Sequence, residues 1–194
     1  MRLADKFTLV RIIYAPVFII CYLIAQSNEG ASLYIIAAIT AVLIFAEITD
    51  YLDGKTARKL NQVSETGKIL DPFADSLLHI SIFFGFCYSG DMPPLLFLFV
   101  FYREFSMLFL RLYATKKGIN IAARLGGKAK TVFYIFTCFW TLAGKLYVRL
   151  PLPPLPFAAQ MHLIGVCLFS VCVLGAYLSF GEYIYRWVLL NKKH

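Results

Sequence analysis

Six apolar runs divide the sequence, and each is long enough to cross a lipid bilayer as an α-helix of about 20 residues. Hydrophobic residues make up 60% of the chain and charged residues 15%, whereas soluble domains carry about 25% charged residues. The sequence therefore predicts an all-α polytopic membrane protein, a bundle of six transmembrane helices, and we expect residues 1–194 to form a single transmembrane domain. The predicted spans are Phe7 to Ala25, Ser32 to Tyr51, Gly67 to Ser89, Pro93 to Thr115, Lys130 to Tyr147 and Phe157 to Leu190.

Positive charge is distributed unevenly between the two ends of this predicted bundle. If the N-terminus is cytoplasmic and the helices alternate in direction, all but two of the 19 Lys and Arg residues lie at or toward the cytoplasmic side. The two exceptions are Lys145 and Arg149. This asymmetry predicts cytoplasmic termini and a location in the cytoplasmic membrane, where the net charge of +8 meets anionic lipid. We expect no nucleic-acid partner, because no soluble surface is available to carry this charge.

Four aspartates interrupt the apolar pattern where the second and third runs approach the cytoplasmic side. Asp50 and Asp53 are three residues apart and Asp71 and Asp75 are four apart, so each pair shares one face of a helix. A short connection should make the two helices antiparallel neighbours and bring all four carboxylates to one end of the bundle. Unpaired carboxylates there would repel one another and take up protons. Because magnesium and manganese prefer hard oxygen ligands, the cluster predicts a site for one or two of these ions.

The residues beside the first aspartate pair indicate what lies next to the metal. Gly54 and Ala57 are small and lie on or near the face of the aspartates, which leaves room for a flat group or a pyrophosphate. Arg58 follows at the interface, where it can pair with phosphate oxygens. These residue types predict a substrate that contains a pyrophosphate.

Together these residues form the pattern D-x2-D-G-x2-A-R-x8-G-x3-D-x3-D. The pattern resembles the defining motif of the CDP-alcohol phosphotransferase family, in which a CDP-linked donor transfers its substituted phosphoryl group to an alcohol and releases CMP. The resemblance implies that Asp75 completes the metal site and acts as the general base. It implies metal ligation by Asp50, Asp53, Asp71 and Asp75. The residues that would shape the cytidine nucleotide pocket are Gly54, Ala57, Arg58 and Gly67.

Two later segments resemble those of the phosphatidylglycerophosphate synthases within that family. They are REFSMLFLR, from Arg103 to Arg111, and GINIAARLGGKAKT, from Gly118 to Thr131. The resemblance implies CDP-diacylglycerol as the donor, glycerol 3-phosphate as the acceptor, and a homodimer among the membrane lipids. The acceptor phosphate needs cations, and Arg103 is also adjacent to Glu104, so an internal ion pair is its alternative role. The predicted ligands of the acceptor phosphate are Arg103, Arg111, Lys128 and Lys130.

The sequence also departs from the family pattern. The first helix of the family often begins P-N-x-L-T-x-x-R; here Thr8 and Arg11 are kept, but the Pro-Asn pair is absent. Ser76 replaces a lysine that is common after the last aspartate. These departures leave inositol phosphate, serine and phosphatidylglycerol as alternative acceptors. We interpret His79, one turn beyond Asp75, as a hydrogen-bonded packing residue.

Two other classes of protein could use such an acidic cluster. Intramembrane prenyltransferases combine paired aspartate motifs with magnesium and a diphosphate donor, but they generally need more helices and leave the Gly-x-x-Ala-Arg element unexplained. A metal transporter would conduct the ion through the carboxylates and would need polar residues in both halves of the membrane. Most of the charge here lies on one side, so both classes are less favoured alternatives.

Overall fold

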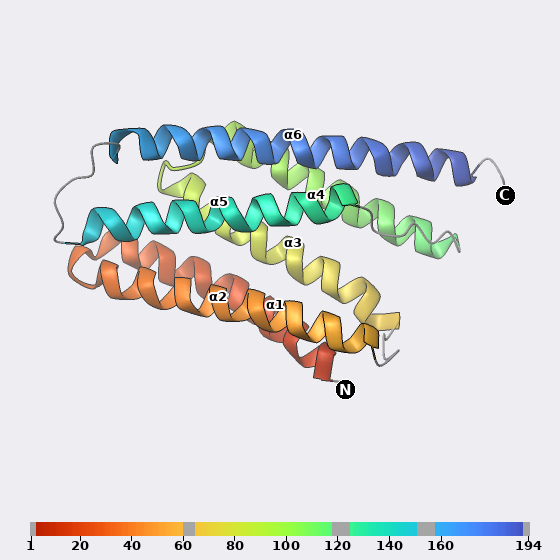
Figure 1. Cartoon of the computed structure of the whole chain (residues 1–194), viewed down its shortest axis with the longest axis horizontal. Helices are drawn as coiled ribbons and strands as arrows, with labels where there is room; N and C mark the ends of the chain where they lie inside the picture. The colour runs from red at the N-terminus through yellow and green to blue at the C-terminus, as the bar shows by residue number, and fades with distance from the viewer. Residues whose placement is uncertain (1–2, 60–64, 118–124, 151–157, 192–194) are drawn as a thin grey trace.

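The described part of the chain consists of six α-helices (Figure 1). The structure is a computed structural model that describes the backbone of residues 3–59, 65–117, 125–150 and 158–191, and the side chains of residues 8–48, 70–117, 130–150 and 160–189. These residues contain no β-strand, so the predicted all-α fold is confirmed. The helices are α1 (Leu3–Ser27), α2 (Glu29–Lys59), α3 (Glu65–Tyr88), α4 (Pro94–Lys116), α5 (Leu125–Arg149) and α6 (Ala158–Asn191).

The helix bounds follow the predicted apolar runs, with two extensions. α2 continues past Tyr51 to Lys59, and α5 begins at Leu125, before the apolar run starts. Five helices, namely α1, α2, α3, α5 and α6, contain stretches long and apolar enough to cross a membrane. Among the described helices α4 does not meet that criterion, and it carries Arg103, Glu104 and Arg111 along its length. These five helices make the chain a multi-pass membrane protein. A sixth membrane span, formed by α4, stays a prediction.

The helices form a closed ring in which α1 lies between α2 and α3. The packed pairs around the ring are α1–α2, α2–α5, α5–α6, α6–α4, α4–α3 and α3–α1, and α3 also contacts α5 across the interior. Within the described residues α2 and α3 do not pack against each other, so the prediction that they are direct neighbours is wrong there. Residues 60–64, which connect the two helices, lie outside the described residues.

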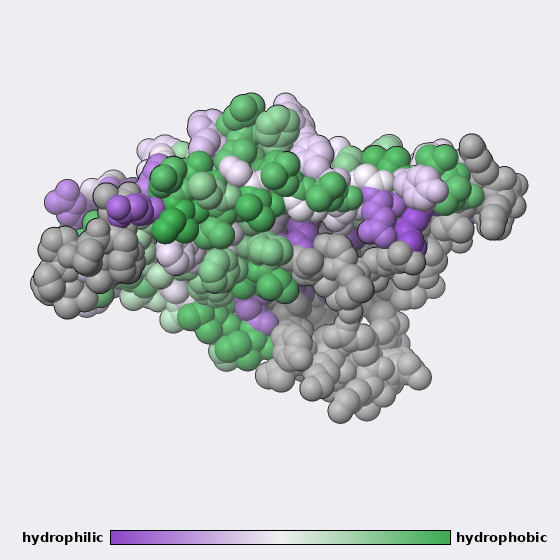
Figure 2. All heavy atoms as spheres, turned by 45° about the horizontal axis from the view of Figure 1, so that its top comes forward, coloured by the Kyte–Doolittle hydropathy of each residue, from purple (hydrophilic) through white to green (hydrophobic). Residues whose placement is uncertain are grey.

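Aromatic side chains fill the middle of the ring. Phe83 of α3 contacts Tyr134 of α5 and Phe169 of α6, with ring centroids 5.0 Å and 5.5 Å apart. The outside of the bundle is apolar as well, and apolar side chains cover most of the middle of the face seen in Figure 2. Because lipid tails are as apolar as these side chains, close packing rather than the hydrophobic effect must hold the helices together.

Gly85 permits the close approach of α1 and α3, and a larger side chain there should disturb their packing. A Cβ atom at this position would lie 3.0 Å from Cδ1 of Tyr22. The Tyr22 ring is fixed between Phe18 and Phe86, with centroids 5.8 Å and 5.7 Å away. We expect Gly85→Val to destabilise the protein by about 1–3 kcal/mol, measured as a lower midpoint of thermal unfolding in detergent. Gly175→Val is the matched control, because a Cβ there meets nothing within 4 Å; equal losses in both variants would contradict the prediction.

Candidate active site

Asp71 and Asp75 lie on one face of α3, near its beginning, and contact the beginning of α1. Thr8 donates a hydrogen bond from Oγ1 to Oδ1 of Asp71. Arg11 donates from Nη1 to Oδ1 of Asp75, and its Nη2 lies 3.8 Å from Oδ1 of Asp71. Since residues four apart are neighbours on a helix surface, one guanidinium can reach both carboxylates. The two aspartates therefore share a face, as their spacing predicts.

Burial divides this cluster into an inner and an outer half. The Arg11 side chain is 9% exposed, whereas the side chains of Asp71 and Asp75 are 50% and 45% exposed. A buried guanidinium needs a compensating carboxylate, and here it uses Oδ1 of each aspartate. In the described part of the chain, Oδ2 of each aspartate makes no hydrogen bond or ion pair. These two outer oxygens are thus available to a ligand.

Seven of the predicted site residues have side chains outside the described set. Their backbones are helical, and α2 ends at the same end of the bundle at which α3 begins (Figure 1). The two halves of the aspartate motif therefore stand at one end, although the meeting of all four carboxylates stays a prediction. The seven residues are Asp50, Asp53, Gly54, Ala57 and Arg58 on α2, Gly67 on α3 and Lys128 on α5.

The described side chains supply part of a metal-ligand set. Oδ2 of Asp71 and Oδ2 of Asp75 are hard donors of the kind that magnesium and manganese bind. No group of three or more His, Cys, Asp or Glu residues able to hold a metal ion occurs among the described residues. The pair fits a divalent ion in ligand type, and a complete set needs carboxylates from outside the described side chains. Asp50 and Asp53 are the ones that the motif provides.

A buried carboxylate, Glu104 of α4, connects four helices next to this pair. Glu104 and its neighbour Arg103 are 2% and 3% exposed. Arg103 Nε also donates to the carbonyl of Ala176 in α6, at 3.2 Å. The hub joins α3, α4, α5 and α6 and holds the helix of the aspartates in place. The groups that donate to the Glu104 carboxylate are Arg103 Nη1 (2.8 Å), Lys130 Nζ (2.7 Å), Ser76 Oγ (3.0 Å) and Tyr134 OH (3.3 Å).

Arg103 has two predicted roles, and these contacts show one of them, while its part in binding the acceptor phosphate stays a prediction. The side chain forms an internal ion pair with Glu104, which is the alternative to binding the acceptor phosphate. Lys130 also pairs with Glu104, is 13% exposed, and holds its ammonium 4.5 Å from the ring centroid of Tyr134. Two cations against one carboxylate leave a net positive charge in this buried cluster. The cluster contacts α3 through Ser76, which donates to Glu104 and directly follows Asp75 in the sequence.

Arg111 is placed differently from Arg103 and Lys130. It lines a cavity of about 160 Å³ between α3 and α4, whose other walls are mainly apolar and include Leu70 and Pro72, the neighbours of Asp71 in the sequence. Within the described residues its guanidinium makes no hydrogen bond or ion pair. Arg111 is therefore a cation available to an anionic group next to the aspartate face.

Comparison with known proteins identifies the family of the chain. The family model of CDP-alcohol phosphatidyltransferase matches residues 1–185. The chain belongs to this family. The predicted resemblance is thereby confirmed, and the residues matched by the family model include the aspartate motif from Asp50 to Asp75.

Individual members of the family resemble the chain over nearly its whole length. A Treponema pallidum (strain Nichols) protein named CDP-diacylglycerol--glycerol-3-phosphate 3-phosphatidyltransferase is 33% identical over 199 residues, covering 100% of this chain and 92% of that protein. A Bacillus subtilis (strain 168) protein of the same name is 31% identical, with 90% and 91% covered. A Mycobacterium tuberculosis (strain ATCC 25618 / H37Rv) protein named probable phosphatidylglycerophosphate synthase is 30% identical, with 95% and 81% covered.

Members of the CDP-alcohol phosphatidyltransferase family generally depend on a divalent metal ion. The outer oxygens of Asp71 and Asp75 agree with that dependence, because their half-exposed carboxylates keep donor atoms free of the guanidinium of Arg11. Arg11 thus fixes the carboxylates without covering the oxygens that a ligand would use.

Sequence reasoning did not identify every residue that organises the site. His79 is a packing residue as interpreted: its Nδ1 lies 2.8 Å from the carbonyl oxygen of Asp75, and its ring packs on Tyr134. Glu104 was considered only as a partner of Arg103, and Arg11 only as a retained motif residue. The signal for both was present, because a charged side chain inside an apolar run needs a partner within the bundle.

Removal of the Glu104 charge should show how much the hub contributes to stability. We expect Glu104→Gln to destabilise the protein by about 3–5 kcal/mol, because it leaves Arg103 and Lys130 buried without their carboxylate. The measurement is the thermal unfolding midpoint in detergent. Glu182→Gln is the matched control, since Glu182 forms an exposed pair with Arg186 (3.5 Å) worth about 0–1 kcal/mol. A similar small loss in both variants would show that the hub is not structural.

Proposed function

We propose that this protein transfers a phosphatidyl group from CDP-diacylglycerol to sn-glycerol 3-phosphate, giving phosphatidylglycerol phosphate and CMP. The observation that carries the proposal is the match to relatives named for this reaction over nine-tenths or more of the chain. The structure also supports it: Asp71 and Asp75 near the start of α3 and Arg111 near the end of α4 lie at the same end of the bundle.

In this proposal Asp50, Asp53, Asp71 and Asp75 hold divalent ions, either Mg²⁺ or Mn²⁺. We favour two ions over one. When bound, such ions neutralise the pyrophosphate of the donor and stabilise the departing CMP. The described residues contribute orientation: Thr8 and Arg11 fix the inner oxygens of the carboxylates, so that the outer oxygens face the ligand side.

Asp75 is the proposed general base. It accepts the proton of the glycerol hydroxyl while that oxygen attacks the phosphorus atom that carries the diacylglycerol group. A new phosphate ester bond forms, the pyrophosphate bond to CMP breaks, and CMP leaves with the electron pair. The contact with Arg11 holds the carboxylate in one orientation, which is what a positioned base requires.

The remaining site residues bind the two substrates in this proposal. Arg111 and Lys128 contact the acceptor phosphate, and Lys130 contributes the net positive charge of the Glu104 hub. Arg103 acts through Glu104 as a positioning residue. The residues proposed to surround the cytidine nucleotide are Gly54, Ala57, Arg58 and Gly67.

We further propose a homodimer in the cytoplasmic membrane, with the active site on the cytoplasmic side and residues 1–194 as one domain. α1 begins and α6 ends at the end of the bundle that carries Asp71 and Asp75 (Figure 1). The positive-inside distribution supports a cytoplasmic location for that end, since nearly all Lys and Arg lie toward it.

A panel of acceptors tests the proposed reaction. Purified protein is incubated with CDP-diacylglycerol, Mg²⁺ or Mn²⁺ and one acceptor at a time, and CMP and the lipid product are measured by mass spectrometry. We expect CMP release with glycerol 3-phosphate. Reaction with inositol phosphate, serine or phosphatidylglycerol in its place would overturn the acceptor. Consumption of a prenyl diphosphate, or ion flux in liposomes without CMP release, would overturn the reaction class.

Asp75→Asn tests the assignment of the base. The amide keeps the shape of the side chain but cannot accept the proton, so turnover should fall by at least about 100-fold while metal-dependent nucleotide binding persists. Asp91→Asn is the control, because Asp91 lies at the other end of the bundle, in an ion pair with Lys145. Turnover by Asp75→Asn at the rate of the control would remove Asp75 as the base.

Arg111→Gln tests the acceptor site. Loss of a charge-assisted hydrogen bond should raise the KM for glycerol 3-phosphate by about tenfold or more, with little change in the KM for CDP-diacylglycerol. Arg186→Gln removes the same charge from α6, where Arg186 pairs with Glu182, and should change neither constant. A rise in the donor KM alone would assign Arg111 to the donor instead.

A further inference from the structure

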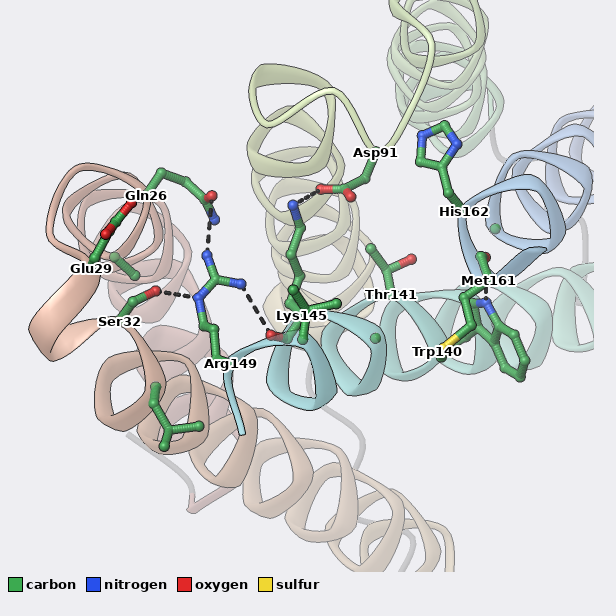
Figure 3. A pocket seen from close by; sticks show the side chains of 15 residues that line it. Gln26, Glu29, Ser32, Asp91, Trp140, Thr141, Lys145, Arg149, Met161 and His162 are labelled. Atoms are coloured by element: carbon green, nitrogen blue, oxygen red, sulfur yellow. Dashed lines mark hydrogen bonds and ion pairs between the residues drawn. The ribbon is translucent and has the colours of Figure 1, made fainter. Parts of the chain in front are cut away.

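A second and larger cavity, of about 600 Å³, lies at the end of the bundle opposite Asp71 and Asp75. Figure 3 shows the side chains that line it. It is formed where α1 and α5 end and where α2 and α6 begin. Its volume is typical of sites that hold a small ligand, about 300–1,000 Å³. No residue assigned to the proposed reaction lines it. The polar and charged side chains in its lining include Gln26, Glu29, Ser32, Asp91, Thr141, Lys145, Arg149 and His162.

The two cations of the cavity differ in how their charge is balanced. Lys145 Nζ lies 2.7 Å from Oδ2 of Asp91, so that pair is neutral. Arg149 is held by neutral acceptors only: Nε donates to Ser32 Oγ, Nη1 to the carbonyl of Lys145 (3.0 Å) and Nη2 to Gln26 Oε1 (3.4 Å). Within the described residues its guanidinium forms no ion pair. Its orientation is thus fixed while its charge stays uncompensated (Figure 3).

Gln26 supplies a second and independent signal. Its Oε1 accepts from Arg149, while its Nε2 is buried and has no hydrogen-bond partner among the residues that the structure describes. A buried donor without an acceptor costs about 1–3 kcal/mol, and a ligand oxygen next to Arg149 would remove that cost. An orphan donor beside an uncompensated guanidinium is an arrangement suited to an anion with several acceptor oxygens.

We propose that this cavity binds a phosphate ester, with Arg149 and Gln26 as its ligands. A guanidinium matches the oxygens of a phosphate and binds two of them at once. The apolar spans of α1 and α5 end at Ser27 and Arg149, so the cavity lies at the depth of lipid headgroups. The phosphate can therefore come from a membrane phospholipid or from a soluble phosphate. Glu29 in the same lining is a carboxylate that can pair with an ammonium group, so phosphatidylethanolamine should bind more tightly than phosphatidylglycerol, whose headgroup carries no positive charge.

Native mass spectrometry of the full-length protein in detergent tests this site. The probes are phosphatidylethanolamine, phosphatidylglycerol and, as a lipid without phosphate, diacylglycerol; inorganic phosphate is added in a separate arm as a competitor. We expect the phospholipids to be retained and diacylglycerol not. Displacement by phosphate would identify a soluble phosphate as sufficient, and no displacement would identify the lipid headgroup as the ligand.

Two substitutions in the cavity test whether Arg149 and Gln26 bind the phosphate. Arg149→Gln removes the charge, and Gln26→Glu supplies Arg149 with an internal carboxylate while keeping an acceptor in the same place. Each should weaken phospholipid binding by about tenfold or more. Both should keep CMP release, because the cavity is remote from the proposed active site, and this activity reports that the variants are folded.

Matched controls separate this cavity from other lipid sites. Arg186→Gln removes a cation near the other end of α6, and Arg111→Gln alters the proposed acceptor site; both should retain phospholipid as the unaltered protein does. If Arg149→Gln and Gln26→Glu release CMP and bind phospholipid as strongly as the unaltered protein, the inference is wrong. Equal retention of diacylglycerol and phospholipid would also overturn it.

Discussion

The cost of a charge inside an apolar bundle governs where this chain places its ionisable side chains. Arg11 is buried and is balanced by Asp71 and Asp75; Glu104 is buried and is balanced by Arg103 and Lys130. Arg11 joins α1 to α3 and Lys130 joins α5 to Glu104 of α4, so these ion pairs also fix the relative positions of the helices. Because lipid gives little hydrophobic drive for helix association, such polar contacts and close aromatic packing carry the specificity of the fold.

The same constraint shapes the candidate active site. Carboxylates at the edge of the membrane are stable only beside positive charge, and the Arg11 guanidinium supplies one unit for two aspartates. The pair therefore keeps a net negative charge on its exposed side, where each Oδ2 is open. That surplus is what a divalent ion could balance, and the buried position of Arg11 leaves the approach clear.

The helices were predictable because an apolar run of about 20 residues has few alternatives to a membrane helix. The apolar run from Ser32 to Tyr51 predicted a helix shorter than α2. The apolar residues end where the polar motif begins, but the helix continues to Lys59. Neighbours around the ring were not predictable, since a short connection limits only the distance between two helix ends. α1 lies between α2 and α3, although it precedes both in the sequence.

Side-chain partners were the least predictable part of the site. The face shared by Asp71 and Asp75 follows from their spacing alone, whereas the Glu104 hub takes its donors from α3, α4 and α5, far apart in the sequence. Arg103 shows the limit directly. Its sequence context matched a substrate ligand and an internal pair equally, and only the structure shows the internal pair.

The distribution of charge along α5 connects both ends of the molecule. Lys130 at one end shares Glu104 with Arg103, so that cluster keeps a net positive charge, whereas Lys145 near the other end is balanced by Asp91 and adds no free charge to its side. Arg149 is different, because it adds a full positive charge to the end of the bundle that the positive-inside rule keeps poor in cations. A cation that opposes the topology signal, and is oriented by three neutral groups, is explained if that end of the bundle binds an anion.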